Sequence, residues 1–206
     1  MGALENNELE QQIIETAKRL FVEKGFVETS MSDIAATVGI NRPTLHYYFR
    51  TKDRMFQAVF SSIVMSLLPR VREIMKRDIP CMERVRIVLD EYLVRFIENP
   101  YIPKFICEEV QRDVNHLLAT AKEMQFEETF AIIKEGLQSE MEAGRLKTVP
   151  LHILFLTFYG LLLFPLLSKN LVVTLFLKED SEFELLLWEW KQYILLHLKN
   201  LLCVDG

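Results

Sequence analysis

Hydrophobic positions recur every three or four residues along most of the chain, which is the spacing of amphipathic helices. The first such stretches cover residues 8–24, 31–38 and 42–49. Further helices are expected from residue 52 past residue 63 and over residues 82–98, 103–116, 120–143, about 150–165 and 182–202. The pattern therefore predicts an all-α protein of about nine helices.

The two short stretches near the N-terminus have strong signals for their starts and stops. Ser30 and Asp33 form a Ser-x-x-Asp capping box, which satisfies free backbone donors at a helix start. Gly39 fits the left-handed position just past a helix, and Asn41 can cap the helix that follows. Two short helices joined by one sharp turn indicate a helix-turn-helix.

The second of these helices has two different sides. Leu45 and Phe49 are four residues apart and are expected to face inward. The opposite side carries cationic, hydroxyl and aromatic side chains, namely Arg42, Thr44, Tyr47 and Tyr48. This side is available to contact a partner molecule, although packing into the core is an equally good reading for one of the two tyrosines.

The stretch resembles the DNA-binding domain of the TetR family of bacterial transcriptional repressors. The matching positions are Leu9 to Phe21, Gly25, Thr29, Ile34-Ala35, Gly39-Ile40, Thr44-Leu45, Tyr48-Phe49, Lys52 and Phe56. The resemblance implies a three-helix DNA-binding domain over residues 8–54 and a larger helical effector-binding and dimerisation domain over residues 55–206. His46 stands where the family most often has tyrosine, and Asn41 where serine is common. Both side chains can still donate hydrogen bonds, so these departures concern the sequence of the operator more than DNA binding itself.

The resemblance also implies roles for individual residues on double-stranded DNA. Arg42 is expected to contact a base edge, because guanidinium pairs bidentately with guanine. Pro43 and Tyr47 are placed to touch thymine methyl groups. Contacts to phosphates are expected from Thr44, Tyr47, Tyr48 and Lys52, with Ser30 and Ser32 as additional candidates.

The charge distribution agrees with a local DNA contact and not with general affinity for nucleic acid. The 206 residues carry a formal net charge of −5, and the first 56 residues hold seven cations and eight anions. Between Ile40 and Arg54, however, there are four cations and Asp53 is the single anion. Positive charge is therefore concentrated around the second short helix.

Aromatic and sulfur-containing side chains on the longer helices could line an effector cavity. The candidates are Tyr92, Phe96, Met124, His152, Phe155 and Tyr159. Each of them is more often an ordinary core residue, and no motif identifies a ligand. If they do form a cavity, it favours a small hydrophobic or aromatic effector, and no cofactor is expected.

The last helix is apolar on nearly all sides, which predicts contact with a second copy of the chain. The expected homodimer interface contains Phe183, Leu187, Trp190, Ile194 and Leu201, and the resemblance likewise implies dimerisation through the final two helices. A run without Asp, Glu, Lys or Arg covers residues 148–168. Pro150 and Pro165 shorten its usable helix, so no membrane span is expected.

Enzymatic function is not expected from this sequence. It contains no Gly-rich phosphate loop, Gly-x-Ser-x-Gly or His-Glu-x-x-His motif. Glu109, Asp113 and His116 share one helix face, but a solvated surface explains them better than a metal site. Three scattered cysteines and the lack of a signal-like N-terminus are typical of a cytoplasmic protein. The alternatives to a regulator are a helical interaction module that does not bind DNA and, less favoured, a small-molecule enzyme.

Overall fold

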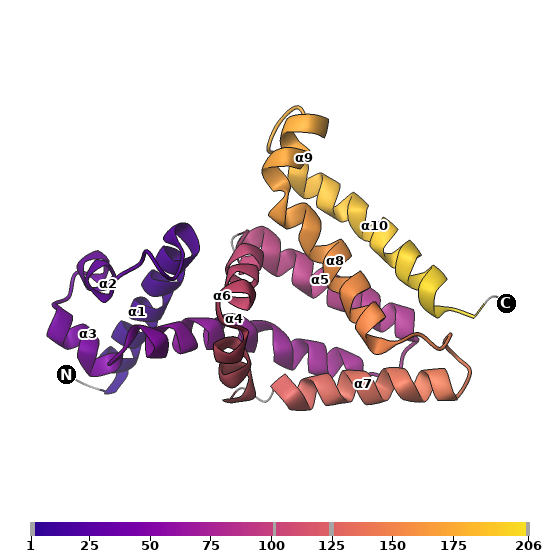
Figure 1. Ribbon diagram of the computed structural model, residues 1–206, viewed down its shortest axis with the longest axis horizontal. Helices are drawn as coiled ribbons and strands as arrows, with labels where there is room; N and C mark the ends of the chain where they lie inside the picture. Colours follow the sequence, from indigo (N-terminus) through magenta and orange to yellow (C-terminus); the bar gives the residue numbers. More distant parts are fainter. Residues whose placement is uncertain (1–2, 101, 124–125, 205–206) are drawn as a thin grey trace. The chain divides into compact units, whose positions relative to one another are not determined.

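The computed structural model describes residues 3–100, 102–123 and 126–204, and they form an all-α structure (Figure 1). The helices are α1 (Ala3–Lys24), α2 (Met31–Val38), α3 (Arg42–Tyr48), α4 (Lys52–Met75), α5 (Cys81–Glu98), α6 (Ile102–Glu123), α7 (Phe126–Glu142), α8 (Leu151–Leu167), α9 (Lys169–Phe176) and α10 (Glu182–Leu202). The extended backbone of Asp113 breaks α6 into two helices. The described residues thus form eleven helices, and the expected number of about nine is wrong.

Two helical features differ from the sequence-based expectation. A proline usually kinks or ends a helix, yet α4 continues through Pro69 to Met75. A proline inside a helix removes one backbone hydrogen bond, and here the apolar side chains on either side of it remain buried at Leu68 and Val71. The short helix α9 was not predicted; Ser168 precedes it, but its side chain makes no capping hydrogen bond to the helix.

The chain divides into two compact units. The first contains residues 1–66 and 104–124, and the second contains residues 67–103 and 125–206. The division falls inside α4, which supplies its first turns to the first unit and its last turns to the second. The expected boundary after residue 54 separates a DNA-binding domain from an effector-binding and dimerisation domain. It is defined by function and not by compactness, so it stays a prediction.

The core of the first unit contains a cluster of aromatic rings from α4, α6 and the segment between α1 and α2. Phe56 is fully buried, and its ring centroid lies 5.3 Å from that of Phe26 and 5.4 Å from that of Phe105. The buried Thr29 hydroxyl donates to the carbonyls of Leu20 and Gly25, at 3.1 and 2.9 Å. These contacts fix the segment between α1 and α2, from which the helix-turn-helix begins.

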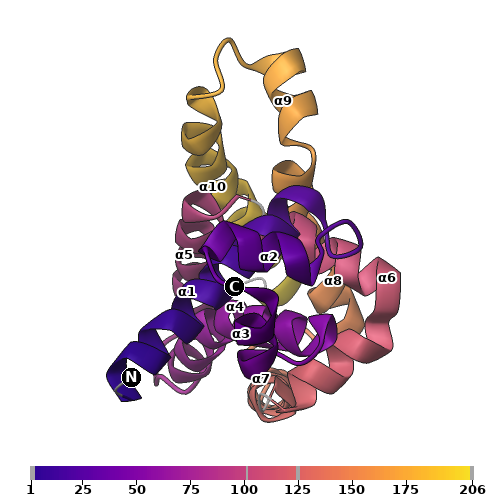
Figure 2. The ribbon, with the colours of Figure 1, turned by 90° about the vertical axis from the view of Figure 1, so that its left-hand side faces the viewer.

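The second unit is built on α10, which packs against α5 and α8 (Figures 1 and 2). An ion pair joins α5 to α10 between Asp90 and Lys191, whose side chain is largely buried. Arg84 of α5 forms a second ion pair with Glu140 of α7, at 3.2 Å. The α9 helix follows the C-terminal end of α8 and has no buried residue.

None of the described helices alone has both the length and the apolar composition needed to cross a membrane. The α8 and α9 helices satisfy those criteria only as a pair, and a bend of 67° separates them.

The expected capping box starts α2. The Asp33 amide donates to Ser30 Oγ at 3.1 Å, and the Ser30 amide donates to Asp33 Oδ2 at 2.9 Å. The Ser30 hydroxyl also donates to Asp33 Oδ2 at 2.7 Å. These hydrogen bonds from Ser30 lower the pKa of Asp33, with a smaller contribution from the charge of Lys24.

This cap predicts an acid-dependent contribution to the stability of the first unit. Since the folded pKa of Asp33 is lowered, the stabilisation is complete above the unfolded pKa of about 3.9 and is lost as the pH falls through the folded pKa. The melting temperatures of the wild type and Asp33→Asn should therefore differ by a constant amount above about pH 4 and converge as the pH falls below about 4. Circular dichroism melts would measure this, and a difference that stayed constant below about pH 4 would contradict it.

Candidate DNA-binding surface and effector cavity

The turn between α2 and α3 places α3 on the surface of the first unit. Gly39 adopts φ 83°, and its amide donates to the carbonyls of Ala35 and Ala36 at the end of α2. The Asn41 side chain then accepts from the Thr44 amide at 2.8 Å and so caps α3. Leu45 is buried as predicted, and its side chain holds α3 against the core of the first unit.

The outward side of α3 carries the residues predicted to contact DNA. Arg42 and Pro43 are exposed, and the Tyr47 side chain is 75% exposed. Tyr48 is half-buried, with its ring edge-to-face against that of Tyr47 at 5.3 Å. The two tyrosines thus differ: Tyr47 presents its ring to solvent, whereas Tyr48 also packs against its neighbour.

Two of the predicted phosphate contacts also have roles inside the protein. The Thr44 hydroxyl donates to the Asn41 side chain at 2.8 Å, and the Ser30 hydroxyl belongs to the α2 cap. Ser32 is exposed in the first turn of α2. DNA contacts by these three residues remain predictions.

Lys52 holds the loop between α1 and α2. Its ammonium donates to the Val27 carbonyl at 2.9 Å and lies 4.5 Å from the centre of the Phe26 ring. An ammonium has three N–H donors, so a phosphate contact by Lys52 remains compatible with this position.

His46 contacts the side chain of Arg42 and the backbone of Arg50. Arg42 Nε donates to His46 Nε2 at 3.3 Å, and His46 Nδ1 lies 3.1 Å from the Arg50 carbonyl oxygen. Nδ1 therefore carries the proton when Nε2 accepts from Arg42. The imidazole orients the Arg42 guanidinium, a role that sequence reasoning missed because it depends on the exact rotamers.

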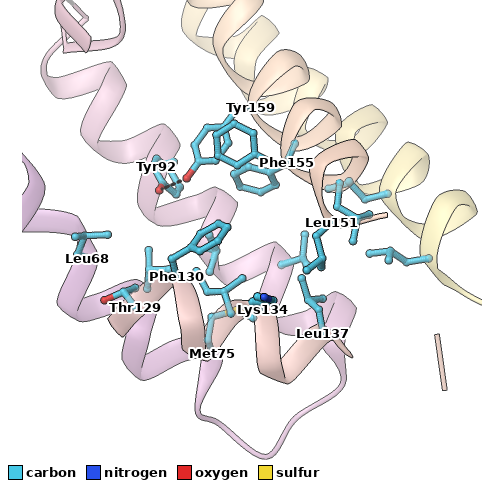
Figure 3. Close-up of a pocket in the computed structure, with 18 residues that line it drawn as sticks. Leu68, Met75, Tyr92, Thr129, Phe130, Lys134, Leu137, Leu151, Phe155 and Tyr159 are labelled. Carbon is cyan, nitrogen blue, oxygen red and sulfur yellow. Dashed lines mark hydrogen bonds between the residues drawn. The ribbon is translucent and has the colours of Figure 1, made fainter. Parts of the chain in front are cut away.

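The second unit contains an apolar cavity of about 160 Å³ (Figure 3). Its walls come from the last turns of α4, from α5, α7 and α8, and from the end of α10. The hydroxyls of Tyr92 and Tyr159 point toward one another at one side of it and form a hydrogen bond of 2.9 Å. Burial raises the pKa of both phenols, so both keep their protons at neutral pH.

Half of the predicted cavity residues lie at this cavity. Tyr92, Phe155 and Tyr159 line it. Phe96 is buried but outside the lining, with its ring 5.6 Å from that of Tyr92, and His152 is exposed near the start of α8. Met124 lies outside the described residues.

The candidate residues from the sequence did not include those that α4 and α7 contribute to the cavity. Those residues are Leu68, Val71, Met75, Thr129, Phe130, Ile133, Lys134 and Leu137. On α7, the spacing of residues 130, 133, 134 and 137 marks one helix face, but it does not distinguish a cavity wall from a filled core.

The residues predicted to form the dimer interface mostly face the interior of their own subunit. Phe183, Leu187 and Ile194 are buried within the second unit, which leaves little of their surface for a second copy of the chain, and their place in an interface stays a prediction. Trp190 and Leu201 are half-buried, and the Trp190 indole N–H donates to the Leu161 carbonyl at 2.9 Å. Other apolar side chains of α8 and α10 are exposed instead, among them Leu156, Phe164, Leu185 and Leu196.

The described side chains contain no group of three or more His, Cys, Asp or Glu residues that could hold a metal ion. The Asp113 side chain is exposed. Those of Glu109 and His116 are not among the described side chains.

Residues 13–59 match the family of bacterial regulatory proteins described as the tetR family. The transcriptional regulator EthR of Mycolicibacterium smegmatis is 41% identical over 61 residues, which are 30% of this chain and 26% of EthR. The nucleoid occlusion factor SlmA of Vibrio atlanticus is 27% identical over 105 residues, which are 51% of this chain and 54% of SlmA. The matches thus span about half or less of these curated relatives.

The similarity in structure extends over most of the chain. The fatty acid degradation regulator FadR of Bacillus halodurans superposes with a TM-score of 0.66, covering 90% of this chain and 97% of FadR. The sequence identity is 17%, so this comparison establishes a shared fold.

Proposed function

Because the chain belongs to the TetR family of bacterial regulatory proteins, we propose that it is a homodimeric transcription regulator that binds operator DNA and responds to a small apolar effector. The observation that carries this proposal is the outward side of α3. A short helix, fixed by a buried leucine and the Asn41 cap, presents an exposed arginine and an exposed tyrosine. Such a helix has the dimensions and the chemistry to enter the major groove.

The proposed complex uses two copies of α3 related by a two-fold axis. They would enter successive major grooves about 34 Å apart and read a palindromic or nearly palindromic operator. In this complex Arg42 contacts a base edge, and the hydroxyl and ammonium groups around it hold phosphates. The net charge of −5 limits non-specific binding, so affinity depends on this local surface.

We propose that the exposed apolar side chains of α8 and α10 form the dimer interface. Leu185 is 72% exposed and Phe164 is 67% exposed, and they lie on two helices that pack against each other. Exposed apolar surface is typical of association sites when it gathers into a patch. Sedimentation velocity at micromolar concentration should give the mass of a dimer. A monomer under those conditions would refute this part of the proposal.

Effector control is proposed to act through α4. This helix is continuous from Lys52 to Met75, and its last turns supply Leu68, Val71 and Met75 to the cavity. A ligand that contacts these side chains differently in the DNA-bound and DNA-free states would change the affinity for the operator. DNA would in turn change the affinity for the ligand, and the coupling free energy is the same in both directions. The proposed role is regulatory and not enzymatic, in the cytoplasm.

Fluorescence anisotropy with the DNA upstream of the coding sequence tests the proposal. We expect tighter binding to this duplex than to a scrambled duplex of equal composition. Between 50 and 200 mM salt the affinity should fall steeply, by about 10³-fold or more for a protein that contacts six or more phosphates. Equal binding to both duplexes would contradict operator recognition and favour the alternative of a helical interaction module.

A further inference from the structure

The tyrosine pair is the main buried polar feature in the wall of the cavity of the second unit. Thr129 is also buried in this wall, and Figure 3 shows it apart from the two tyrosines. Among the described residues of its wall, polar side-chain groups belong to Tyr92, Tyr159, Thr129 and Lys134, and the others are hydrocarbon or thioether. Lys134 is exposed, and Figure 3 shows it beside Leu137, away from the two tyrosines. A ligand inside the cavity would therefore meet polar atoms mainly at the tyrosine hydroxyls.

The tyrosine pair has hydrogen-bonding capacity left over. Two neutral phenols supply two O–H donors, and the bond between Tyr92 and Tyr159 uses one of them. The second O–H and a free lone pair remain, and no further partner of either hydroxyl occurs among the described residues. A buried donor without a partner is costly, so a ligand group that pairs with it gains affinity.

The size of the cavity limits the ligand. Its volume of about 160 Å³ resembles that of an apolar cavity of about 150 Å³ that binds benzene. One six-membered ring with a single small substituent fills such a space. Drug-sized ligands occupy roughly 300 Å³ or more, so part of such a ligand would extend beyond this space.

The chemistry of the wall favours an aromatic ring without charge. The Phe155 and Tyr159 rings lie 4.8 Å apart, and the Phe158 and Tyr159 rings 5.1 Å apart. Such rings offer faces and edges to another aromatic group. Among the described residues that line the cavity, none with an acidic or basic side chain lies at the buried tyrosine pair, so an ionic ligand would lose its hydration without gaining a counter-charge there.

We infer that the cavity binds a neutral molecule with one aromatic ring and one hydroxyl or carbonyl group, which hydrogen-bonds to the Tyr92–Tyr159 pair. This inference rests on the proposed effector-binding function and names the chemical class of its ligand. The ring packs against the aromatic side chains of α8, and the polar substituent takes the place of the missing hydrogen-bond partner.

Isothermal titration calorimetry of the full chain with phenol, toluene and benzoate tests this inference. In the variant Tyr92→Phe/Tyr159→Phe, phenol affinity should fall about fivefold or more, because its hydroxyl loses its partner. Toluene affinity should change less than twofold, which also shows that the variant retains its cavity. The wild type should bind benzoate at least tenfold more weakly than phenol.

Tyr193→Phe is the matched control, because it removes a phenolic hydroxyl from the exposed side of α10. It should leave the affinities for phenol and toluene unchanged. Equal losses of phenol and toluene affinity in the double variant, no loss of phenol affinity, or benzoate binding as tight as phenol binding would each overturn the inference.

These titrations contain no DNA, so they separate the two proposals. A chain that binds its operator but not phenol overturns the inference about ligand class alone. A chain that binds phenol through the tyrosine pair but recognises no operator confirms the site and overturns the proposed regulatory function.

Discussion

Replacing Arg42 by alanine should weaken operator binding about 5- to 150-fold. The Arg42 side chain is exposed on α3, and a bidentate contact between a guanidinium and guanine is worth about 1–3 kcal/mol. His46 holds the guanidinium at 3.3 Å, so the side chain is partly ordered before DNA binds. The measurement is a fluorescence anisotropy titration at a fixed salt concentration.

The matched control for this change is Arg77→Ala. Arg77 is exposed in the second unit, just after α4, and its replacement removes the same formal charge. Arg77→Ala should alter operator affinity less than twofold. If both variants lost affinity equally, general electrostatics and not a base contact by Arg42 would explain the effect.

Replacing Phe56 by alanine should lower the free energy of unfolding of the first unit by about 3–5 kcal/mol. The side chain is fully buried, and four other rings surround it: those of Phe21, Phe26, Phe60 and Phe105. Alanine would leave a cavity and remove these contacts. Urea unfolding followed by circular dichroism measures the change.

Tyr47→Ala provides a stability control for the Phe56 variant. It also truncates an aromatic side chain in the first unit, but that side chain is 75% exposed. Its cost in free energy of unfolding should stay below about 1 kcal/mol, as is usual for surface positions. A loss for Phe56→Ala no larger than that for Tyr47→Ala would contradict the described core.

The helix-turn-helix could be predicted from the sequence because its signals are local. The Ser30–Asp33 box, the left-handed Gly39 and the Asn41 cap each act within a few residues, and the structure contains all three. The buried position of Leu45 follows from the helical period alone. No distant part of the chain is needed to specify these features.

The surfaces of the second unit could not be predicted in the same way. The last helix is apolar on nearly all sides, so its period does not show which side meets α5 and α8. Phe183 and Ile194 pack inside the subunit, whereas Leu196, two positions beyond Ile194, is exposed. That choice depends on tertiary contacts.

The cavity is still harder to predict because it is a space left by several helices together. Tyr92 and Phe96 lie one turn apart on α5, yet Tyr92 lines the cavity and Phe96 is packed beside it. The hydrogen bond between Tyr92 and Tyr159 joins residues 67 positions apart. No pattern within one helix indicates such a pairing.

Selection from a random duplex library is the most direct measurement of sequence recognition by α3. The wild-type protein should enrich a two-fold symmetric motif whose half-sites lie about 34 Å, or one turn of DNA, apart. The Arg42→Ala variant should enrich the same motif without the preference for a G·C pair at one symmetric position. No enrichment by the wild type, or an identical motif from the variant, would contradict DNA reading through this helix.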